Sequence, residues 1–388
     1  MSFFFDQKEL TAFTQRLIQT PSNSGDEGCI AAIIADEMER LGYEEVAVDR
    51  KHNVIGVIKG GKPGKNLLYN GHIDHAEVGS MDKPYAGEIM DGSAFGTTGP
   101  VIYGRGACDM KAAVAAMVYA GAQLQKEKAD LPGNVFITAV ALEEQARGEG
   151  ITYLLDNTTD HFDAAISGEA TDMEVHLGHR GKFEYLLSVY GETSHASSPT
   201  RGINAIFLMN KLLTEIEENY ARKLPEHEFL GKATLTVIDI LAKPGRLTPV
   251  VPDYCEIVLD RRYLPGEDRA FVEKEITAMF NHLQDKYPQF RAEYKQIKDF
   301  PVLFSLPEEA IVKAVQKTVG VVMQKTPILR AWRFGVDGAF IARRGIPCVG
   351  FGPGNEDFAH TSEDHVSIDD IFTAVKVYQH VPYHLNEQ

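Results

Sequence analysis

The stretch that decides how this chain is interpreted is an apolar run that ends in a glycine, two imidazoles and a carboxylate: Asn66-Leu67-Leu68-Tyr69-Asn70-Gly71-His72-Ile73-Asp74-His75. Because side chains alternate along a strand, His72 and Asp74 would share one face and Ile73 the other. A metal ligand would then lie beside a carboxylate that can accept its second ring N–H. This is expected at the carboxyl end of a strand, where open α/β sheets bind their ligands. A satisfied polar pair is the alternative.

The composition is typical of a globular protein with more than one domain. The chain has 388 residues, 44% of them hydrophobic and 24% charged, which predicts two or three domains. No apolar run approaches the roughly 18 residues that would span a bilayer, and the N-terminus does not resemble a signal peptide. The net charge of −16 disfavours nucleic-acid and anionic membrane partners. We therefore expect a cytoplasmic protein with no membrane or nucleic-acid partner.

Cysteine usage limits the kind of metal site that the chain can build. The four cysteines, at positions 29, 108, 255 and 348, lie far apart and form no CxxC pair. A disulfide framework or a thiolate zinc site is not expected from this spacing. Any metal must then be held by His, Asp and Glu side chains, which suits zinc, manganese or cobalt.

Helical periodicity and β-rich runs alternate through the first part of the chain. The predicted helices cover residues 10–18, 30–41 and 109–125, and the predicted strands cover 45–49, 53–58, 66–74, 134–142 and 164–168. Residues 79–103 are rich in glycine and turn formers. A long loop directly after a candidate site strand is typical of a functional loop.

The pattern changes after Gly178 and returns near residue 300. Strands are predicted at 181–190, 233–240 and 255–264, with helices at 204–220 and 267–287, which indicates an α+β insert. Strand–helix alternation resumes with segments 308–319, 338–343 and 347–352, and a last helix runs from 368 to about 380. We predict a catalytic domain of residues 1–177 and 298–388, interrupted by an inserted domain of residues 178–297.

Polar side chains follow several of the predicted strands or the loops after them. They are His72 with Asp74, Asp109, the pair Glu143-Glu144, Glu169 and, after a glycine-rich turn, His360. Two imidazoles and three carboxylates, one of them bridging, are what a pair of divalent ions about 3.5–4 Å apart requires. Each acid alone would be read as structural or solvated. Together, at one edge of one sheet, they predict a metal site.

The glycines of Gly104-Arg105-Gly106 could be taken for a phosphate-binding loop. The match is weak, because the segment lacks the third glycine of the dinucleotide fingerprint and the lysine-serine of a P-loop. A nucleotide-binding α/β protein is therefore the third-ranked interpretation. Asp109, which follows, could also serve only as a helix cap.

In this order the motifs resemble those of the M20 family of metallopeptidases and amidohydrolases. The resemblance is carried by Gly71-His72-x-Asp74, Gly104-Arg105-Gly106-x-x-Asp109-Met110-Lys111, Glu143-Glu144, Gly168-Glu169-Ala170-Thr171 and Phe351-Gly352-Pro353-Gly354 followed by Ala359-His360. It covers nearly the whole chain. Within the family, Arg201-Gly202, Phe229-Leu230-Gly231-Lys232 and Asp260-Arg261-Arg262 look closest to the selenium-metabolism-linked hydrolases.

The resemblance implies a di-zinc exopeptidase-like α/β domain, with a mixed sheet flanked by helices, and an inserted α+β lid and dimerisation domain. It also implies a set of ligands for each of two divalent ions. The ions would most commonly be zinc, with cobalt or manganese as alternatives. One ion would be held by His72, Asp109 and Glu169, and the other by Asp109, Glu144 and His360. Asp109 would bridge the ions, and Asp74 would orient His72.

The catalytic and substrate-binding roles follow from the same resemblance. Glu143 would be the general base towards a metal-activated water, and His195 of the insert would donate to the oxyanion, usually from the other subunit of a homodimer. A histidine that only caps nearby backbone is the alternative for His195.

The resemblance also places substrate-binding residues in the insert. Arg180 and one of two neighbouring arginines, with Arg262 a better match than Arg261, would bind a substrate carboxylate. Asn204 lies in the same substrate-facing motif. Each of these could instead be a solvated surface residue.

Three departures from the family pattern concern the substrate rather than the metals. They are Pro249-Val250-Val251-Pro252, His75 after Asp74, and Trp332-Arg333-Phe334-Gly335-Val336-Asp337. We expect a zinc-dependent hydrolase that cleaves the amide C–N bond of an N-acyl or N-carbamoyl amino acid or of a short peptide. A true exopeptidase is the nearest rival, and a non-catalytic metal-binding scaffold of the same fold is the alternative from another class.

Overall fold

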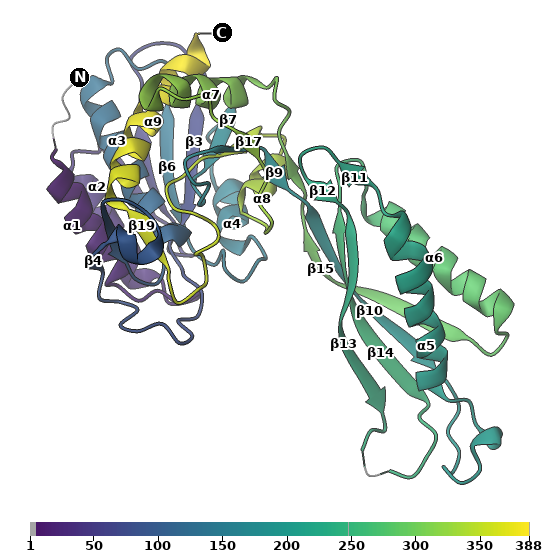
Figure 1. Ribbon diagram of the computed structural model, residues 1–388. Helices are drawn as coiled ribbons and strands as arrows, with labels where there is room; N and C mark the ends of the chain where they lie inside the picture. Colours follow the sequence, from purple (N-terminus) through teal and green to yellow (C-terminus); the bar gives the residue numbers. More distant parts are fainter. Residues whose placement is uncertain (1–4, 247, 388) are drawn as a thin grey trace. The chain divides into compact units, whose positions relative to one another are not determined.

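The structure is a computed structural model that describes residues 5–246 and 248–387, and these form two compact units (Figure 1). Unit 1 comprises Met1–His179 and Leu303–Gln388, and unit 2 comprises Arg180–Val302. The insert was expected to end at residue 297. That position lies within strand β15 (Arg291–Phe300), so the second unit extends to the end of this strand and slightly beyond it.

Unit 1 is built on an eight-stranded mixed sheet, as expected. Its order is β1-β2-β6-β3-β7-β18-β8-β17. The neighbours β6, β3, β7 and β18 run parallel, so their carboxyl ends meet at one edge of the sheet. The strand bounds are β1 (Glu45–Val48), β2 (Val54–Ile58), β3 (Leu67–His72), β6 (Val135–Val140), β7 (Ala164–Ser167), β8 (Val175–His176), β17 (Leu329–Arg330) and β18 (Cys348–Gly350).

Strand β3 ends at His72 and lies between β6 and β7 in the sheet. Every one of its residues is buried. Gly71 explains how the next helix comes so close to it. A Cβ at this position would lie 2.8 Å from Cε of Met110 and 2.9 Å from Cγ2 of Val114. The glycine therefore allows the segment that carries Asp109 to pack directly against the end of β3.

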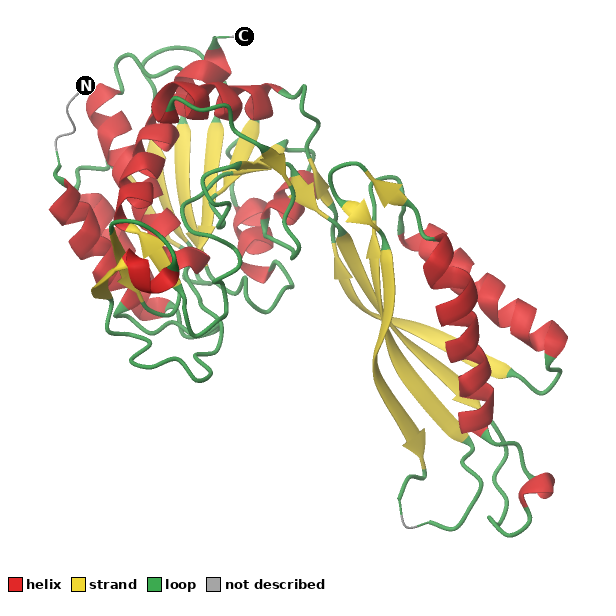
Figure 2. Ribbon diagram, viewed as in Figure 1, coloured by secondary structure: helices red, strands yellow, loops and turns green. Residues whose placement is uncertain are grey.

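Helices flank the sheet of unit 1 (Figure 2). The most buried is α3 (Ala112–Glu127), an alanine-rich helix whose residues are buried from Ala112 to Gln125. Its close packing depends on Gly121, where a Cβ would lie 2.0 Å from the hydroxyl oxygen of Tyr43. The others are α1 (Gln7–Ile18), α2 (Gly28–Arg40), α4 (Glu149–Asn157), α7 (Ala310–Met323), α8 (Gly338–Arg343) and α9 (Ile368–Asn386). None of the helices among the described residues has both the length and the hydropathy of a membrane span.

The segment 79–103 is more ordered than the sequence predicted. It contains strands β4 (Glu88–Asp91) and β5 (Pro100–Tyr103), which pair with each other and, through β5, with β19 (His365–Ser367). Short strands between glycines give no recognisable alternation, which is why this segment was expected to be a loop. The prediction also missed helix α4 and the two-residue strands β9 (Gly178–His179) and β16 (Leu303–Phe304), which pair.

Unit 2 is an antiparallel sheet covered on one face by two helices (Figures 1 and 2). The sheet order is β13-β14-β10-β15. Residues of β14 alternate strictly between buried and half-buried, as expected of a sheet with one covered face. The elements are β10 (Gly181–Tyr190), β13 (Thr234–Lys243), β14 (Tyr254–Tyr263), β15, helices α5 (Ala205–Glu215) and α6 (Arg269–Lys286), and the small hairpin of β11 (Glu226–His227) and β12 (Gly231–Lys232).

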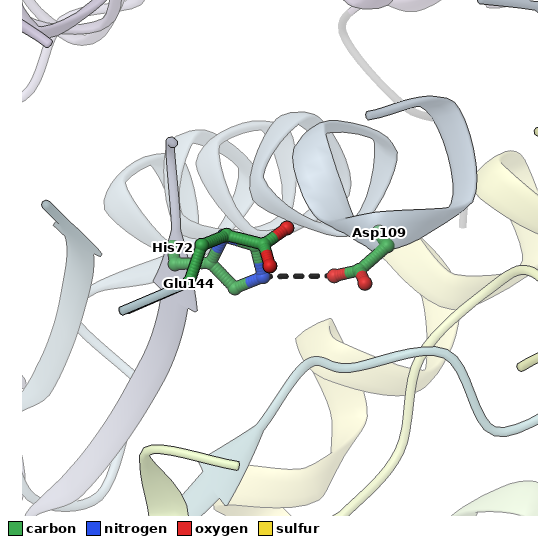
Figure 3. A group of neighbouring side chains, drawn as sticks. All are labelled: His72, Asp109 and Glu144. Atoms are coloured by element: carbon green, nitrogen blue, oxygen red, sulfur yellow. Dashed lines mark hydrogen bonds and ion pairs between the residues drawn. The ribbon is translucent and has the colours of Figure 1, made fainter. Parts of the chain in front are cut away.

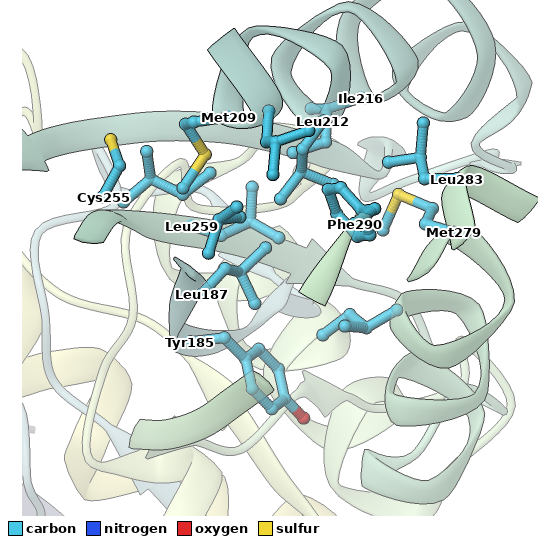
Figure 4. Close-up of a cluster of buried hydrophobic side chains, with 14 of the residues drawn as sticks. Tyr185, Leu187, Met209, Leu212, Ile216, Cys255, Leu259, Met279, Leu283 and Phe290 are labelled. Carbon is cyan, nitrogen blue, oxygen red and sulfur yellow. The ribbon is translucent and has the colours of Figure 1, made fainter. Parts of the chain in front are cut away.

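The core of unit 2 lies between its sheet and its helices (Figure 4). Tyr185 and Leu187 come from β10, Leu259 from β14, and Met209 and Met279 from the two helices, and each is at least 99% buried. This unit thus has a hydrophobic core of its own.

Candidate metal centre

His72 is fixed at the end of β3 by a backbone hydrogen bond. Its side chain is 2% exposed, and its Nδ1 lies 2.9 Å from the carbonyl oxygen of Asp74. A carbonyl can only accept, so Nδ1 donates to it, and Nε2 is the ring atom that faces the cluster. Nε2 lies 2.8 Å from Oδ1 of Asp109 (Figure 3). Burial would lower the pKa of this ring, but the carboxylates of Glu169 and Asp109 outweigh burial and raise it well above its usual value, so Nε2 donates to Asp109. A divalent cation that binds both groups would replace this proton.

Asp109 lies between two imidazoles. Its Oδ1 faces His72, and its Oδ2 lies 3.0 Å from Nε2 of His360. Burial would raise the pKa of this carboxyl, but the hydrogen bonds from both imidazoles outweigh burial and hold the pKa well below its usual range. The backbone of Asp109 is not helical (φ −126°, ψ 91°), and the helices that begin around it have no side-chain cap. Its side chain is therefore turned to the imidazoles and not used as a helix cap.

Glu144 and His360 complete the exposed side of the cluster. Nε2 of His360 lies 3.2 and 3.1 Å from the two carboxylate oxygens of Glu144. The potential ligand atoms of His72, Asp109 and Glu144 all lie within 4.8 Å of one another, and Figure 3 shows these three side chains converging.

Glu169 provides the clearest sign that this cluster suits a cation. Its Oε1 lies 3.6 Å from Nε2 of His72, and its buried Oε2 has no hydrogen-bond partner in the described part of the chain. Burial, opposed by His72, raises the pKa of this carboxyl well above its usual value. A buried carboxylate without a donor is costly unless a cation or a proton compensates its charge. The residues present therefore fit the two divalent ions that the motifs imply.

Asp74 lies beside His72, as its position suggested, and it also contacts the Glu143-Glu144 segment. Its carboxylate Oδ1 is 3.5 Å from Nδ1 of His72, farther away than its own carbonyl oxygen. The two carboxylate oxygens accept the backbone N–H groups of Glu143 and Glu144, each at 3.1 Å, and Oδ2 also accepts from Ser24 Oγ at 2.6 Å. The Asp74 carboxylate thus fixes the backbone of the Glu143-Glu144 pair, and its carbonyl fixes His72.

Glu143 is buried beside this network and is not a member of the ligand cluster. Its side chain is 8% exposed. Burial raises the pKa of its carboxyl well above the usual value, although His72 opposes the rise. The neighbouring residues Glu143 and Glu144 therefore have different surroundings, as expected for adjacent side chains that diverge at a strand end.

His75, whose role the sequence left open, is a structural anchor. Its Nε2 accepts the backbone N–H of Ser22 at 3.0 Å, and its Nδ1 lies 2.8 Å from the carbonyl oxygen of Ala76. The ring is therefore neutral, and burial lowers its pKa to about 4. Ser22 also donates its hydroxyl to the carbonyl of Ile73 at 2.7 Å. Both contacts hold the loop between α1 and α2 against the end of β3.

Asp364, which the sequence reasoning did not single out, holds the turn before Asp109. Its carboxylate accepts the backbone N–H groups of Gly106 at 2.7 Å and Cys108 at 2.8 Å, and it pairs with Arg105 at 3.1 Å. These are the N–H groups that a phosphate would need in a glycine-rich loop. Because a protein carboxylate already binds them, the nucleotide-binding interpretation has no support here.

Asp337 is a second buried carboxylate that the motifs did not assign to a role. It is 2% exposed, and neither of its oxygens has a hydrogen-bond partner among the described residues. Burial raises its pKa to about 7. In the sequence, Asp337 stood out only as part of segment 332–337, which departs from the family pattern. No local signal in the sequence reveals that it is buried.

The predicted residues of the insert all lie in unit 2. The exposed His195 accepts the backbone N–H of Ser197 at Nδ1, 3.2 Å away, which leaves Nε2 as the protonated nitrogen of the neutral ring. Asn204 is the N-cap of α5 and accepts from the backbone N–H groups of Ile206 and Phe207.

The arginines of the insert differ in exposure. Arg261 is fully buried and pairs with Glu267 at 2.6 Å, so it is part of the core of unit 2. Arg262 is 29% exposed and pairs with Asp260 at 2.8 Å. Arg180 donates to the carbonyl of Lys232, and burial, followed by the nearby charge of Arg262, lowers its pKa. Of the two neighbouring arginines, Arg262 is the one with an accessible guanidinium.

Comparison with known proteins identifies the family of the chain. A model of peptidase family M20/M25/M40 matches residues 68–384. The uncharacterised protein YgeY of Escherichia coli is 31% identical, over 97% of this chain and 94% of the relative. An N-formyl-4-amino-5-aminomethyl-2-methylpyrimidine deformylase of Bacillus subtilis is 26% identical over 96% and 93%. A succinyl-diaminopimelate desuccinylase of Xanthomonas campestris is 27% identical over 91% and 92%.

Solved structures show the same fold. The aminopeptidase PepT of Bacillus cereus matches with a TM-score of 0.77 and 19% identity over 98% of this chain and 99% of its own. YxeP of Bacillus subtilis, a dinuclear metal-binding peptidase of the M20 family, matches with a TM-score of 0.77 and 15% identity over 98% of both chains. The resemblance drawn from the motifs is confirmed, and the chain belongs to the M20/M25/M40 peptidase family, a family of hydrolases.

Proposed function

We propose that this protein is a two-metal hydrolase that cleaves the amide C–N bond of an N-acyl or N-carbamoyl amino acid, or of a dipeptide. The observation that carries the proposal is Asp109, whose two oxygens face different imidazoles in a cluster with Glu144. Beside them, the buried Oε2 of Glu169 has no hydrogen-bond partner in the described part of the chain. Relatives named as a deformylase and a desuccinylase support an amide substrate.

The ligand sets are those that the motifs imply. His72, Asp109 and Glu169 would hold one ion, and Asp109, Glu144 and His360 the other, with zinc expected first and cobalt or manganese as alternatives. When bound, such ions polarise the scissile carbonyl and lower the pKa of the attacking water. The protein prepares this site by fixing the ring of His72 through the carbonyl of Asp74.

Glu143 is proposed as the general base. Its carboxylate would take a proton from the attacking water and deliver it to the leaving nitrogen as the C–N bond breaks. The two backbone hydrogen bonds to Asp74 hold the Glu143-Glu144 segment in place, so that one side chain can bind a cation while its neighbour stays available for the proton.

Unit 2 is proposed as a lid and dimerisation domain. His195 would donate its Nε2–H to the oxyanion that forms at the carbonyl, from the second subunit of a homodimer. Arg180, Arg262 and Asn204 would bind the substrate on the same side. Two features support these roles: the Nε2 of His195 has no hydrogen-bond partner among the described residues, and the guanidinium of Arg262 is accessible.

The decisive experiment combines metal analysis with a change at Glu143. We expect about two divalent ions per chain and hydrolysis of at least one compound in a screen of N-acetyl, N-succinyl and N-carbamoyl amino acids and dipeptides. Glu143→Gln should lower kcat by about 10²–10⁴-fold with the metal content unchanged. Glu149→Gln, on the exposed first turn of α4, is the matched control and should keep full activity. A metal-free protein that is fully active would refute the two-metal mechanism.

The role of His195 is tested separately by subunit mixing. The inactive His195→Ala and Glu143→Ala proteins, once mixed and shown to form hybrid dimers, should recover activity, because one of the hybrid sites holds both an intact base and an intact donor. If the hybrid dimers were inactive, the proposal that His195 donates to the oxyanion from the other subunit would be wrong. The proposal for the metal cluster would not be affected.

A further inference from the structure

A polar cavity of about 310 Å³ lies in unit 1 between the loops that follow β7 and β18. This volume is at the lower end of the range for small-molecule sites. Charged side chains of both signs line it. Its walls are formed by Thr171, Asp172, His176, Arg330, Ala331, Arg333, Asn355, Glu356 and Asp357.

Two of the charged groups in this cavity are not used by the protein itself. In the described part of the chain, neither Arg330 nor Asp172 has a side-chain hydrogen bond or an ion pair within 4.0 Å. The other guanidinium, that of Arg333, is already paired with Glu356 at 2.9 Å and with Asp357. The cavity therefore offers one cationic and one anionic group that remain open to a ligand.

The remaining polar groups of the cavity pair with neither charge, although the charge of Arg330 opposes the rise that burial causes in the pKa of Asp172. His176 is buried, and burial followed by the charge of Arg330 lowers its pKa to about 3, so the ring is neutral. Thr171 is saturated, because its hydroxyl both donates to the carbonyl and accepts the N–H of Gly352. A small ligand that carries both an anionic and a cationic group would match this arrangement.

The cavity lies within reach of the metal cluster. Asp172 follows Glu169 by three residues, and Asp357 precedes His360 by three. Three residues span at most about 11 Å between Cα atoms, even when fully extended. A side chain of a diamino acid, extended from this cavity, covers most of such a gap.

We propose that this cavity, in place of the arginines of the insert, binds the free α-carboxylate of the substrate on Arg330 and its free α-ammonium on Asp172. The substrate would then be a diamino acid acylated on its side-chain nitrogen, and the insert arginines would contact its acyl part. The inference rests on the proposed function. Water adds to the acyl carbon and the bond to the side-chain nitrogen breaks. The products are a carboxylic acid and the free diamino acid, whose released nitrogen receives the proton.

Paired isomers test this assignment. The metal-loaded enzyme is given Nε-acetyl-lysine and Nα-acetyl-lysine, with the corresponding isomers of ornithine and 2,3-diaminopropionate to find the preferred length. We expect the side-chain-acylated isomer to be the better substrate by about tenfold or more in kcat/KM, because only it keeps the zwitterionic end. Charged hydrogen bonds contribute about 1.5–3 kcal/mol, which corresponds to roughly 10–100-fold.

The variants are chosen so that the backbone is preserved. Asp172 has a left-handed φ of 55°, which asparagine tolerates well, so Asp172→Asn removes the charge without strain. Asp172→Asn and Arg330→Met should each raise KM for the side-chain-acylated isomer about tenfold or more, with kcat within about threefold. Asp172→Asn should leave KM for the α-acylated isomer unchanged, because that isomer has no free α-ammonium. Arg330→Lys should restore part of the affinity. The control is Arg344→Ala, which removes a surface arginine that pairs with Asp156 outside the cavity.

A binding measurement separates failure of this inference from failure of the proposed function. Calorimetry with free lysine, ornithine and 2,3-diaminopropionate should detect binding of at least one of them to the metal-loaded wild type, and weaker binding to Asp172→Asn and Arg330→Met. If a diamino acid binds in this way but no amide is cleaved, the cavity assignment stands and the proposed function falls. If amides are cleaved but neither variant differs from Arg344→Ala in KM or binding, the cavity assignment is overturned.

Discussion

The two imidazoles that face Asp109 come from unlike parts of unit 1. His72 ends a strand whose residues are all buried, is 2% exposed, and has its ring fixed by the carbonyl of Asp74. His360 lies in the loop between β18 and β19, has a left-handed φ of 62°, and its side chain is 55% exposed. Its ring contacts are the carboxylates of Asp109 and Glu144.

This difference indicates that the two sides of the cluster are prepared in different ways. The sheet itself builds the His72 side, whose position is fixed before any ion binds. The His360 side depends on a loop, so part of its order must come from binding. We therefore expect two ions of unequal affinity, with the tighter one on the His72 side. The following predictions are ordered from the largest expected effect to the smallest.

Asp109→Asn should abolish the difference in metal affinity between the His72 side and the His360 side, because it weakens the binding of both ions. Asparagine offers one carbonyl oxygen where the carboxylate offers two charged ones, so neither ion keeps its shared ligand. We expect the metal content to fall from about two ions per chain to below one, and kcat to fall at least about 10³-fold, which corresponds to several kcal/mol of lost stabilisation. Metal analysis of the dialysed protein would contradict this if two ions remained.

His72→Ala and His360→Ala should differ in stability even without metal. Removal of His72 leaves the buried Glu169 without an imidazole beside it and Asp109 with that of His360 alone, and we expect the free energy of unfolding to fall by about 3–5 kcal/mol. Removal of the exposed His360 should cost at most about 1 kcal/mol. Urea unfolding of the metal-free proteins measures both values, and equal losses would show that the loop side is as firmly built as the strand side.

The His72 side is also the part of the site that the sequence predicted best. An apolar run that stops at Gly71-His72 indicates a strand end, and parallel neighbours bring other strand ends to the same edge. These signals are local, so the group of His72, Asp109 and Glu144 could be expected before the fold was known.

The contacts that hold this group in place were not predictable in the same way. Asp364 binds the turn before Asp109 from a distant segment, and its role depends on backbone N–H groups that are invisible in a sequence. His75 anchors Ser22 for the same kind of reason. Strand β15 was missed although its burial alternates, because its half-buried face carries Gln296 and Lys298 and so shows no continuous apolar alternation in the sequence.

Asp74→Asn tests how the Glu143-Glu144 pair is held. Asparagine would present an N–H₂ group to one of the two backbone N–H groups that the carboxylate now accepts, while the carbonyl that fixes His72 remains. We expect metal affinity to fall about 10–100-fold on the Glu144 side and to change little on the His72 side. If calorimetric titration showed the reverse, orientation of His72 would be the main role of this carboxylate.

The matched control for that change is Asp49→Asn. Asp49 also accepts two backbone N–H groups, those of Lys51 and Asn53, but it lies in the turn between β1 and β2. The control variant should lose stability without any change in metal affinity. This separates the loss of a backbone contact as such from the loss of that contact at the metal cluster.

His75→Gln should have the smallest effect at neutral pH and a clear effect in acid. The folded protein lowers the pKa of His75 to about 4, whereas the unfolded chain titrates near 6.5. Between these values the unfolded state binds more protons, so the wild type is fully stabilised above pH 6.5 and loses this contribution as the pH falls towards 4. From pH 7 to pH 5 the loss is about 2 kcal/mol.

Glutamine can still accept from Ser22 and does not titrate, so the variant should be destabilised by about 1 kcal/mol at pH 7 and should lack this part of the acid sensitivity. The measurement is the free energy of unfolding as a function of pH. If it changed with pH in the same way for wild type and variant, His75 would be charged in the folded protein and would not be a neutral anchor.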